Sequence, residues 1–80
     1  MTIEKMRELI HAQPFEPFVV HLADGRNVSI NHPDFISSSP TGRVIHVFHG
    51  TGDASTFIDV LLVTALEIKN GGGPANVGNP

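Results

Sequence analysis

The stretch from Phe18 to Ile30 constrains the fold more than any other part of the chain. Apolar and polar residues alternate on both sides of the sequence Ala23-Asp24-Gly25-Arg26, which is rich in turn-forming residues. The pattern predicts two strands, Phe18 to Ala23 and Asn27 to Asn31, joined as an antiparallel hairpin. We expect Asp24 and Gly25 to form its structural turn.

Two turn lengths would give this hairpin different registers. A two-residue type I′ loop would place Val20 and Leu22 on the same face as polar residues of the second strand. A three-residue loop with Gly25 in a left-handed bulge instead pairs Leu22 with Val28 and Val20 with Ile30. All four apolar side chains then share one face. Because one step of register exchanges the two faces of a strand, the apolar pattern favours the bulged turn.

An amphipathic helix is predicted before the hairpin. Apolar residues recur there every three or four positions over residues 3–12, and Pro14 ends the run. The apolar stripe of this helix consists of Ile3, Met6, Leu9 and Ile10. Such a stripe has to cover other apolar side chains, so the helix is expected to pack on the strands.

Three further strands are predicted after a turn-rich region that ends at Gly42. They span Arg43 to His49, Thr56 to Val60 and Thr64 to Lys69, with a single helical turn at Leu61 to Val63. The expected fold is α+β and mostly β. It is an N-terminal helix followed by a five-stranded, antiparallel, partly open barrel of the SH3-like or Sm-like kind.

Length and composition predict one small domain. Residues 1–69 carry the periodic patterns, whereas residues 70–80 are rich in glycine and are expected to be a disordered tail. The chain has 80 residues and no cysteine, which excludes disulfides and thiolate ligands. No apolar run is long enough to span a membrane and nothing resembles a signal peptide, so we expect a cytoplasmic protein.

The charge pattern disfavours nucleic acid as a partner. The net charge is −3, and the five basic residues are scattered along the chain. Binding to a phosphate backbone usually needs basic residues gathered in a stripe or patch.

The second predicted hairpin carries the candidate interaction face. If His49 lies opposite Thr56, then His46 lies opposite Asp59 and Phe48 lies opposite Phe57. The candidate face consists of His46, Phe48, Phe57 and Asp59, extended by Val44 and Leu61. The other side of the same hairpin carries Ile45, Val47, Ile58 and Val60 and is expected to face the core. Because both sides are apolar, the outer side needs a cover, either the helix or another copy of the chain.

Metal and catalytic chemistry find little support in the sequence. His46 and His49 are three apart, and on a strand such residues point to opposite faces and do not bind one ion. A hydrolase would need a nucleophile such as Ser37, Ser38 or Ser39 near a histidine and Asp59, but no nucleophile-elbow motif is present. We therefore expect no catalytic residues, no metal and no cofactor.

Two resemblances accompany these patterns. The segment Val20-x-Leu22-x-x-Gly25-x-x-Val28-x-Ile30 resembles the first half of the Sm motif, in which a glycine turn joins two bent strands. The residues Leu61 to Thr64 lack the glycine and basic charge of its second half. The whole chain more closely resembles a group of small uncharacterised bacterial proteins. The matching residues are Gln13-Pro14-Phe15-x-Pro17-Phe18, His21 to Arg26, His32-Pro33-Asp34-Phe35 and Asp59-x-Leu61 to Thr64.

These observations lead to one functional hypothesis and two alternatives. The leading hypothesis is a non-enzymatic protein-interaction module that binds a partner protein or forms a homo-oligomer. The resemblance to the Sm motif gives an RNA-binding protein as the first alternative. The second is a small metal-dependent or hydrolytic enzyme.

Overall fold

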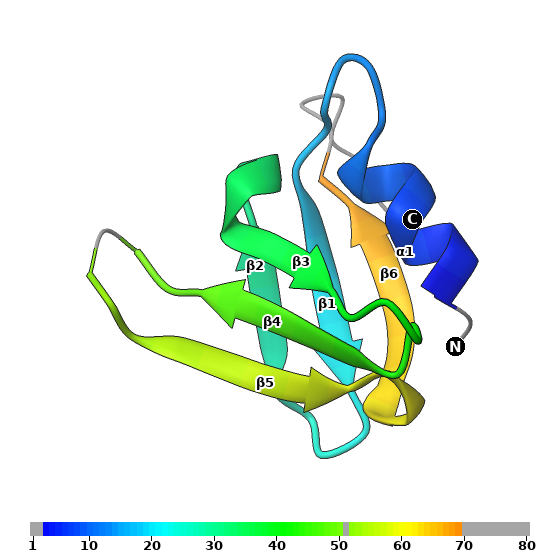
Figure 1. The fold of residues 1–80 in the computed structure, drawn as a ribbon, viewed down its shortest axis with the longest axis vertical. Helices are drawn as coiled ribbons and strands as arrows, with labels where there is room; N and C mark the ends of the chain where they lie inside the picture. Colours follow the sequence, from blue (N-terminus) through cyan, green and yellow to red (C-terminus); the bar gives the residue numbers. More distant parts are fainter. Residues whose placement is uncertain (1–2, 51, 70–80) are drawn as a thin grey trace.

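One helix and six strands make up the fold, as seen in a computed structural model that describes residues 3–50 and 52–69 (Figure 1). The helix is α1 (Ile3–Ile10). The strands are β1 (Phe18–Leu22), β2 (Asn27–Ile30), β3 (Ile36–Ser38), β4 (Val44–Phe48), β5 (Ser55–Asp59) and β6 (Val63–Ile68), and two 3-10 turns are η1 (Pro33–Phe35) and η2 (Val60–Leu62). The predicted disordered tail, 70–80, lies outside the described residues.

The strands form two antiparallel three-stranded sheets, in the orders β2-β1-β6 and β3-β4-β5. The β3-β4-β5 sheet lies in front of the other sheet in Figure 1, and α1 lies at the right-hand side of the molecule. The prediction of a mostly β, α+β fold with an N-terminal helix is confirmed. The prediction of five strands in one partly open barrel is wrong, because six strands divide into two separate sheets.

The strand missing from the prediction is β3. Its sequence, Ile36-Ser37-Ser38, followed by Pro40, is typical of a turn. It is a strand because it pairs with β4 along its whole length, with Ile36 opposite Val47 and Ser38 opposite Ile45. A segment this short is defined by its neighbour and not by its own residue preferences.

A single core joins the two sheets and the helix. Its largest fully buried side chains come from all three: Met6 from α1, Phe18 and Ile30 from one sheet, and Ile45 and Val47 from the other. Full burial of such a side chain contributes about 1.5–3 kcal/mol to stability. The two inner faces and the helix stripe therefore stabilise one another, and neither sheet has a separate core.

The helix stripe is buried as predicted, but the helix is two residues shorter than expected. Ile3, Met6 and Ile10 are buried, and Leu9 is partly buried against the core. The amide of Ala12 bonds to the carbonyl of Leu9, three residues back, so the last turn tightens and the α-helix ends at Ile10.

Arg7 fastens the polar side of the helix to the second sheet. Its Nε donates to Ser38 Oγ at 3.2 Å, and a terminal guanidinium nitrogen donates to the Ser39 carbonyl at 3.0 Å. These bonds fix α1 against the end of β3, on the side of the core.

The first hairpin has the predicted turn, with a correction to its pairing. Gly25 has a φ of +92°, and its amide bonds to the Leu22 carbonyl, so Ala23-Asp24-Gly25 is a three-residue loop. The predicted pairs of Leu22 with Val28 and Val20 with Ile30 are wrong by two residues. The loop places Leu22 opposite Arg26, so Val20 pairs with Val28, and Phe18 with Ile30. A shift of two preserves the faces, which explains why the predicted apolar face is correct.

Two glycines with positive φ offer a matched test of this packing. Gly25→Ala is expected to cost about 1 kcal/mol or more, because alanine resists positive φ. Gly42, at φ +74°, is buried, and a Cβ there would lie 2.6 Å from Ile3 Cγ2. Gly42→Ala should therefore cost about 1–3 kcal/mol more than Gly25→Ala. Denaturant unfolding measures both; Gly50→Ala, with positive φ and open space, is the control. Equal losses at Gly42 and Gly25 would contradict the contact with the helix.

The turn also predicts a pH effect at Asp24. The Arg26 amide donates to the Asp24 carboxylate at 3.0 Å and the Arg26 Nε donates at 2.7 Å, so the pKa of Asp24 is lowered. The stability this carboxylate adds is complete above its unfolded pKa, about 3.9, and is lost as pH falls through the lower folded pKa. NMR titration of the wild type and Arg26→Gln checks this. The variant keeps the amide bond, so the pKa of Asp24 should rise only in part; an ordinary pKa in the wild type would contradict the turn geometry.

Candidate functional site

The outer side of the β4–β5 hairpin carries a cluster of aromatic side chains. Alternation places Val44, His46 and Phe48 of β4 on this side, together with Ser55, Phe57 and Asp59 of β5. These six residues are called the aromatic face below. The residues between them, Ile45, Val47 and Ile58, are buried in the core, and so is Val60 directly after β5, as predicted.

The predicted residues share this face, but their pairing differs from the prediction. His46 lies opposite Phe57 and not opposite Asp59, and Phe48 lies opposite Ser55. The predicted register places His49 opposite Thr56. Their side chains do bond, with His49 Nε2 and Thr56 Oγ1 2.6 Å apart, but His49 pairs along the backbone with Ala54. The contact between His49 and Thr56 is therefore diagonal, and the true register is shifted by two residues.

Three rings form a continuous stack on the aromatic face. The rings of His46 and Phe57 are nearly parallel, with centroids 4.2 Å apart and an interplanar angle of 14°. The Phe48 ring also contacts His46, with centroids 4.5 Å apart and an interplanar angle of 45°. Such ring pairs contribute about 0.5–1.5 kcal/mol beyond their area burial. The stack holds the exposed phenylalanines in defined positions.

The aromatic face is exposed. The exposed fraction is 70% for Phe57 and 41% for Phe48, and Leu61, just after β5, is 82% exposed. The prediction that α1 could cover this face is wrong. The apolar stripe of α1 is buried in the core, and the β4–β5 hairpin extends to the opposite side of the molecule in Figure 1.

Asp59 has a structural role at the edge of the face. Its Oδ1 accepts a hydrogen bond from the Leu61 amide at 2.9 Å, which caps η2. The predicted helical turn at Leu61 to Val63 is therefore real but begins one residue earlier, at Val60. The predicted pairing of Asp59 with His46 is wrong: among the described residues no ion pair joins them.

His46 is the least satisfied polar group of the face. It is half-buried between the two phenylalanines, and its Nε2 is buried without a hydrogen-bond partner among residues 3–50 and 52–69. This unpartnered nitrogen is not predictable from the sequence pattern, because the predicted register places the Asp59 carboxylate opposite the ring. An unpartnered buried nitrogen is costly, so His46 lowers stability where it stands.

The candidate nucleophiles are not assembled into a catalytic site. Ser37 lies opposite His46 across the β3–β4 pair, Ser38 accepts a bond from Arg7, and Ser39 Oγ accepts bonds from the amides of Arg43 and Val44. Asp59, which a triad would need, accepts a hydrogen bond from the Leu61 amide through Oδ1. Ser39 thus shapes the β3–β4 turn, as the sequence suggested.

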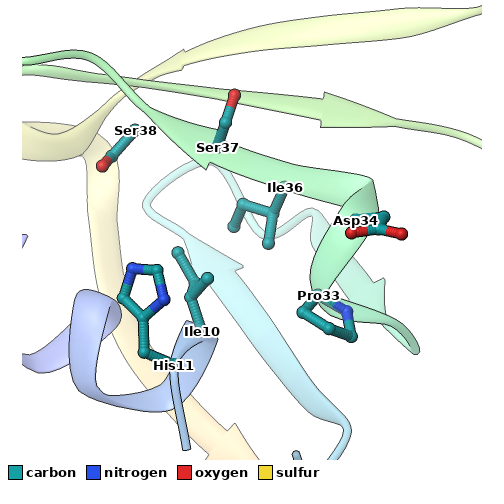
Figure 2. A pocket seen from close by; sticks show the side chains of 7 residues that line it. All are labelled: Ile10, His11, Pro33, Asp34, Ile36, Ser37 and Ser38. Carbon is teal, nitrogen blue, oxygen red and sulfur yellow. The ribbon is translucent and has the colours of Figure 1, made fainter.

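A separate cavity of about 390 Å³ lies between α1, η1 and β3 (Figure 2). It is lined by Ile10, His11, Pro33, Asp34, Ile36, Ser37 and Ser38. In Figure 2 Asp34 is separated from His11 and Ser38 by Ile36, and the Ser37 hydroxyl points away from the helix. Within the described part of the chain, no hydrogen bond joins a serine, a histidine and a carboxylate at this cavity.

The histidines are dispersed over the fold. His21 Nε2 lies 2.9 Å from Glu67 Oε1 on the first sheet, and His32 Nδ1 accepts the Asp34 amide ahead of η1. His11 follows the helix, His46 lies on β4, and His49 directly follows β4 and contacts Thr56. No group of three metal-ligating side chains converges among the described residues.

Three of the five basic side chains lie away from the aromatic face, whereas Arg43 directly precedes β4 and lines a cavity with Asp59 and Leu61. Lys5 pairs with Glu8 at 3.4 Å, Arg26 pairs with Asp24 at 2.7 Å, and Arg7 bonds to the end of β3. These residues belong to α1 and to the first turn.

Among residues 3–50 and 52–69, no helix has the length and the apolar composition of a membrane-spanning segment.

Comparison with known proteins adds no assignment, since no family model, curated protein or solved structure matches the chain. The geometry of the aromatic face is therefore the basis for the function proposed below.

The buried nitrogen of His46 leads to a stability prediction. His46→Phe keeps a ring between Phe48 and Phe57 and removes the unpartnered polar atom, so it should raise the free energy of unfolding by about 1 kcal/mol. His49→Phe is the matched control, because His49 is exposed and its Nε2 has a partner in Thr56. Denaturant unfolding measures both. A His46→Phe variant that is less stable than wild type would contradict the description of this stack.

Proposed function

We propose that this chain is a non-enzymatic protein-interaction module and that the aromatic face is its contact surface. The observation that carries the proposal is the exposure of Phe57, 70%, within a pre-formed stack of three rings. Apolar side chains scattered singly on a surface need no explanation, but a contiguous group does. Here Val44, Phe48, Phe57 and Leu61 are all exposed on or beside one side of one hairpin.

The chemistry of the face suits a protein partner. Aromatic side chains are over-represented among the residues that dominate binding energy in protein interfaces. The stack already restricts the rings, so binding would lose little further side-chain entropy. The four exposed apolar side chains offer on the order of 400–500 Å² of surface, which is the size of a functional patch on a small domain.

RNA binding, the Sm-like alternative, has one feature in its favour and one against it. Exposed rings on a sheet can stack with unpaired bases. A nucleic-acid surface also needs cations along the path of the phosphates. Three of the five basic side chains, Lys5, Arg7 and Arg26, are engaged on α1 and in the first turn. This balance favours a protein partner.

The test compares two matched surface variants. Phe57→Ser removes the most exposed ring, whereas Ile68→Ser removes a 45% exposed aliphatic side chain from β6 in the other sheet. Full-length chains, each immobilised, are exposed to a soluble extract of the source cells. We expect the wild type and Ile68→Ser to retain the same protein, either this chain or another, and Phe57→Ser to lose it at least tenfold.

Chemical-shift mapping with the retained protein completes the experiment. Amide shifts should change along β4 and β5 and not along β2. Retention that Phe57→Ser leaves unchanged, or shifts confined to the first sheet, would overturn the proposal. Recovery of nuclease-sensitive RNA in place of protein, lost on adding salt, would overturn it in favour of the Sm-like alternative.

A further inference from the structure

We infer that a second copy of this chain binds at the β5 edge of the aromatic face, by antiparallel pairing of the two β5 strands about a two-fold axis at Phe57. This inference rests on the proposed function, because it names the partner of the same hairpin. It follows from the direction of the β5 backbone groups, from the residues that the symmetry would bring together and from the surface available.

The backbone of β5 has hydrogen-bonding groups that point away from the sheet. The His49 amide bonds to the Ala54 carbonyl at one end of the β4–β5 ladder, and the Val60 amide bonds to the Arg43 carbonyl at the other, both at 2.9 Å. Bonded pairs alternate with non-bonded pairs in an antiparallel ladder. The pair of His46 and Phe57 therefore falls between bonded pairs, and the N–H and C=O groups of Phe57 point outward.

The same alternation applies to the two other outward residues, Ser55 and Asp59. Among the described strands, β4 is the sole neighbour of β5, so this row of groups lies on an open edge. Unpaired edge groups are a template for another strand. Phe57 is the middle one of these three outward residues. A two-fold axis at Phe57 therefore brings outward-pointing residues of one copy opposite outward-pointing residues of the other.

A two-fold axis at Phe57 makes the edge complementary to itself. It places Phe57 opposite Phe57 of the second copy, and Ser55 of each copy opposite Asp59 of the other. Phe57 then forms two backbone bonds with its counterpart, and each Asp59 amide can donate to the Ser55 carbonyl of the other copy, in one continuous six-stranded sheet. The Asp59 carbonyl, as the N-cap of η2, already accepts a bond within its own chain. The carboxylate of Asp59 faces a serine hydroxyl, which can donate to it, and the two Asp59 residues lie at opposite ends of the new ladder. No like charges are brought face to face.

The other edges of the two sheets are less suited to this pairing. β3 has three residues, and β6 carries the charged Glu67. β2 has only four residues. Its side chains at Asn27 and Ser29 are exposed and polar, and its apolar Ile30 is buried. Charged residues and short strands are the usual protection of edges against pairing. β5 has five residues with a single charge, Asp59, at its end, and it carries the most exposed ring, Phe57.

The surface available is enough for a reversible dimer. Pairing the strands and seating Phe57 and Leu61 against the second copy would bury roughly 400–500 Å² per copy, estimated from about 150–250 Å² for one exposed aromatic side chain. The total, about 800–1,000 Å², lies below the usual range for stable interfaces and is in the range of weak, reversible ones.

The first test is hydrogen exchange of the full chain as a function of concentration. In the monomer, the outward amides of Phe57 and Asp59 exchange quickly, whereas those of Thr56 and Ile58 bond to β4 and are protected. In the dimer, the outward amides become protected as well. We expect the exchange of Phe57 and Asp59 to slow at least tenfold between about 1 µM and 1 mM, following the dimer fraction from sedimentation. Self-association without protection at Phe57 would overturn the inference.

The second test uses the predicted opposition of Ser55 and Asp59. Ser55→Lys places an ammonium opposite each carboxylate and should tighten the dimer about two- to tenfold, whereas Ser55→Asp should weaken it by a similar factor. Phe57→Lys should abolish dimerisation, because two like charges then meet at the axis. Ile68→Lys, on β6 of the other sheet, is the matched control and should leave the dimer unchanged. Circular dichroism confirms that each variant is folded.

The outcomes separate this inference from the proposed function. A wild type that stays monomeric at 1 mM, but retains a different protein through Phe57, would overturn the dimer and leave the interaction surface in place. A dimer that Ser55→Lys weakens would overturn the register. A monomer that also retains no protein would overturn both.

Discussion

The burial of the α1 stripe between the two sheets is the contact on which the rest of the structure depends. Each sheet has three short strands and one apolar inner face, and neither face is closed by the other alone. Met6 reaches complete burial beside Phe18 of the first sheet and Ile45 of the second, so the helix completes the core. A chain of 80 residues buries only about 60–65% of its unfolded surface, so its stability depends on every part of this core.

The position of α1 also determines which surface remains open. The helix has one apolar stripe, and that stripe is committed to the core, while Arg7 fastens its polar side to Ser38 and Ser39. Nothing apolar on the helix is left to cover the aromatic face. The residues alternating with that face, Ile45, Val47 and Ile58, are among the most deeply buried of the structure. The exposed rings therefore stand on a rigid support, as a contact surface requires.

The sequence predicted faces and turns better than exact partners. The alternation around Gly25 identified the loop and the buried face, and the spacing of Ile3, Met6 and Ile10 identified the helix stripe. Both registers were wrong by two residues, a shift that leaves every side chain on its correct face. Apolar alternation carries no information that separates such registers; the loop geometry does, and it depends on the folded chain.

Two features of the site were outside the reach of pattern reasoning. β3 reads as a serine-rich turn, and it is a strand only because β4 offers a partner for it. The stack of His46 on Phe57 requires the true register, in which Asp59 lies opposite Val44 and caps η2 instead of facing His46. The four residues of the predicted interaction face do share one surface, since that depended on alternation alone. Whether they bind a partner stays a prediction.

The central claim is that residues 3–50 and 52–69 leave the aromatic face uncovered. Relaxation of side-chain protons by a soluble paramagnetic agent, measured on the full chain at low micromolar concentration, tests it most directly. The ring protons of Phe57 and Phe48 should relax strongly, whereas the methyl protons of Ile45 and Val47 should be shielded. Shielding of the Phe57 ring in the dilute monomer would contradict the account, because some part of the same chain would then occupy the surface assigned to a partner.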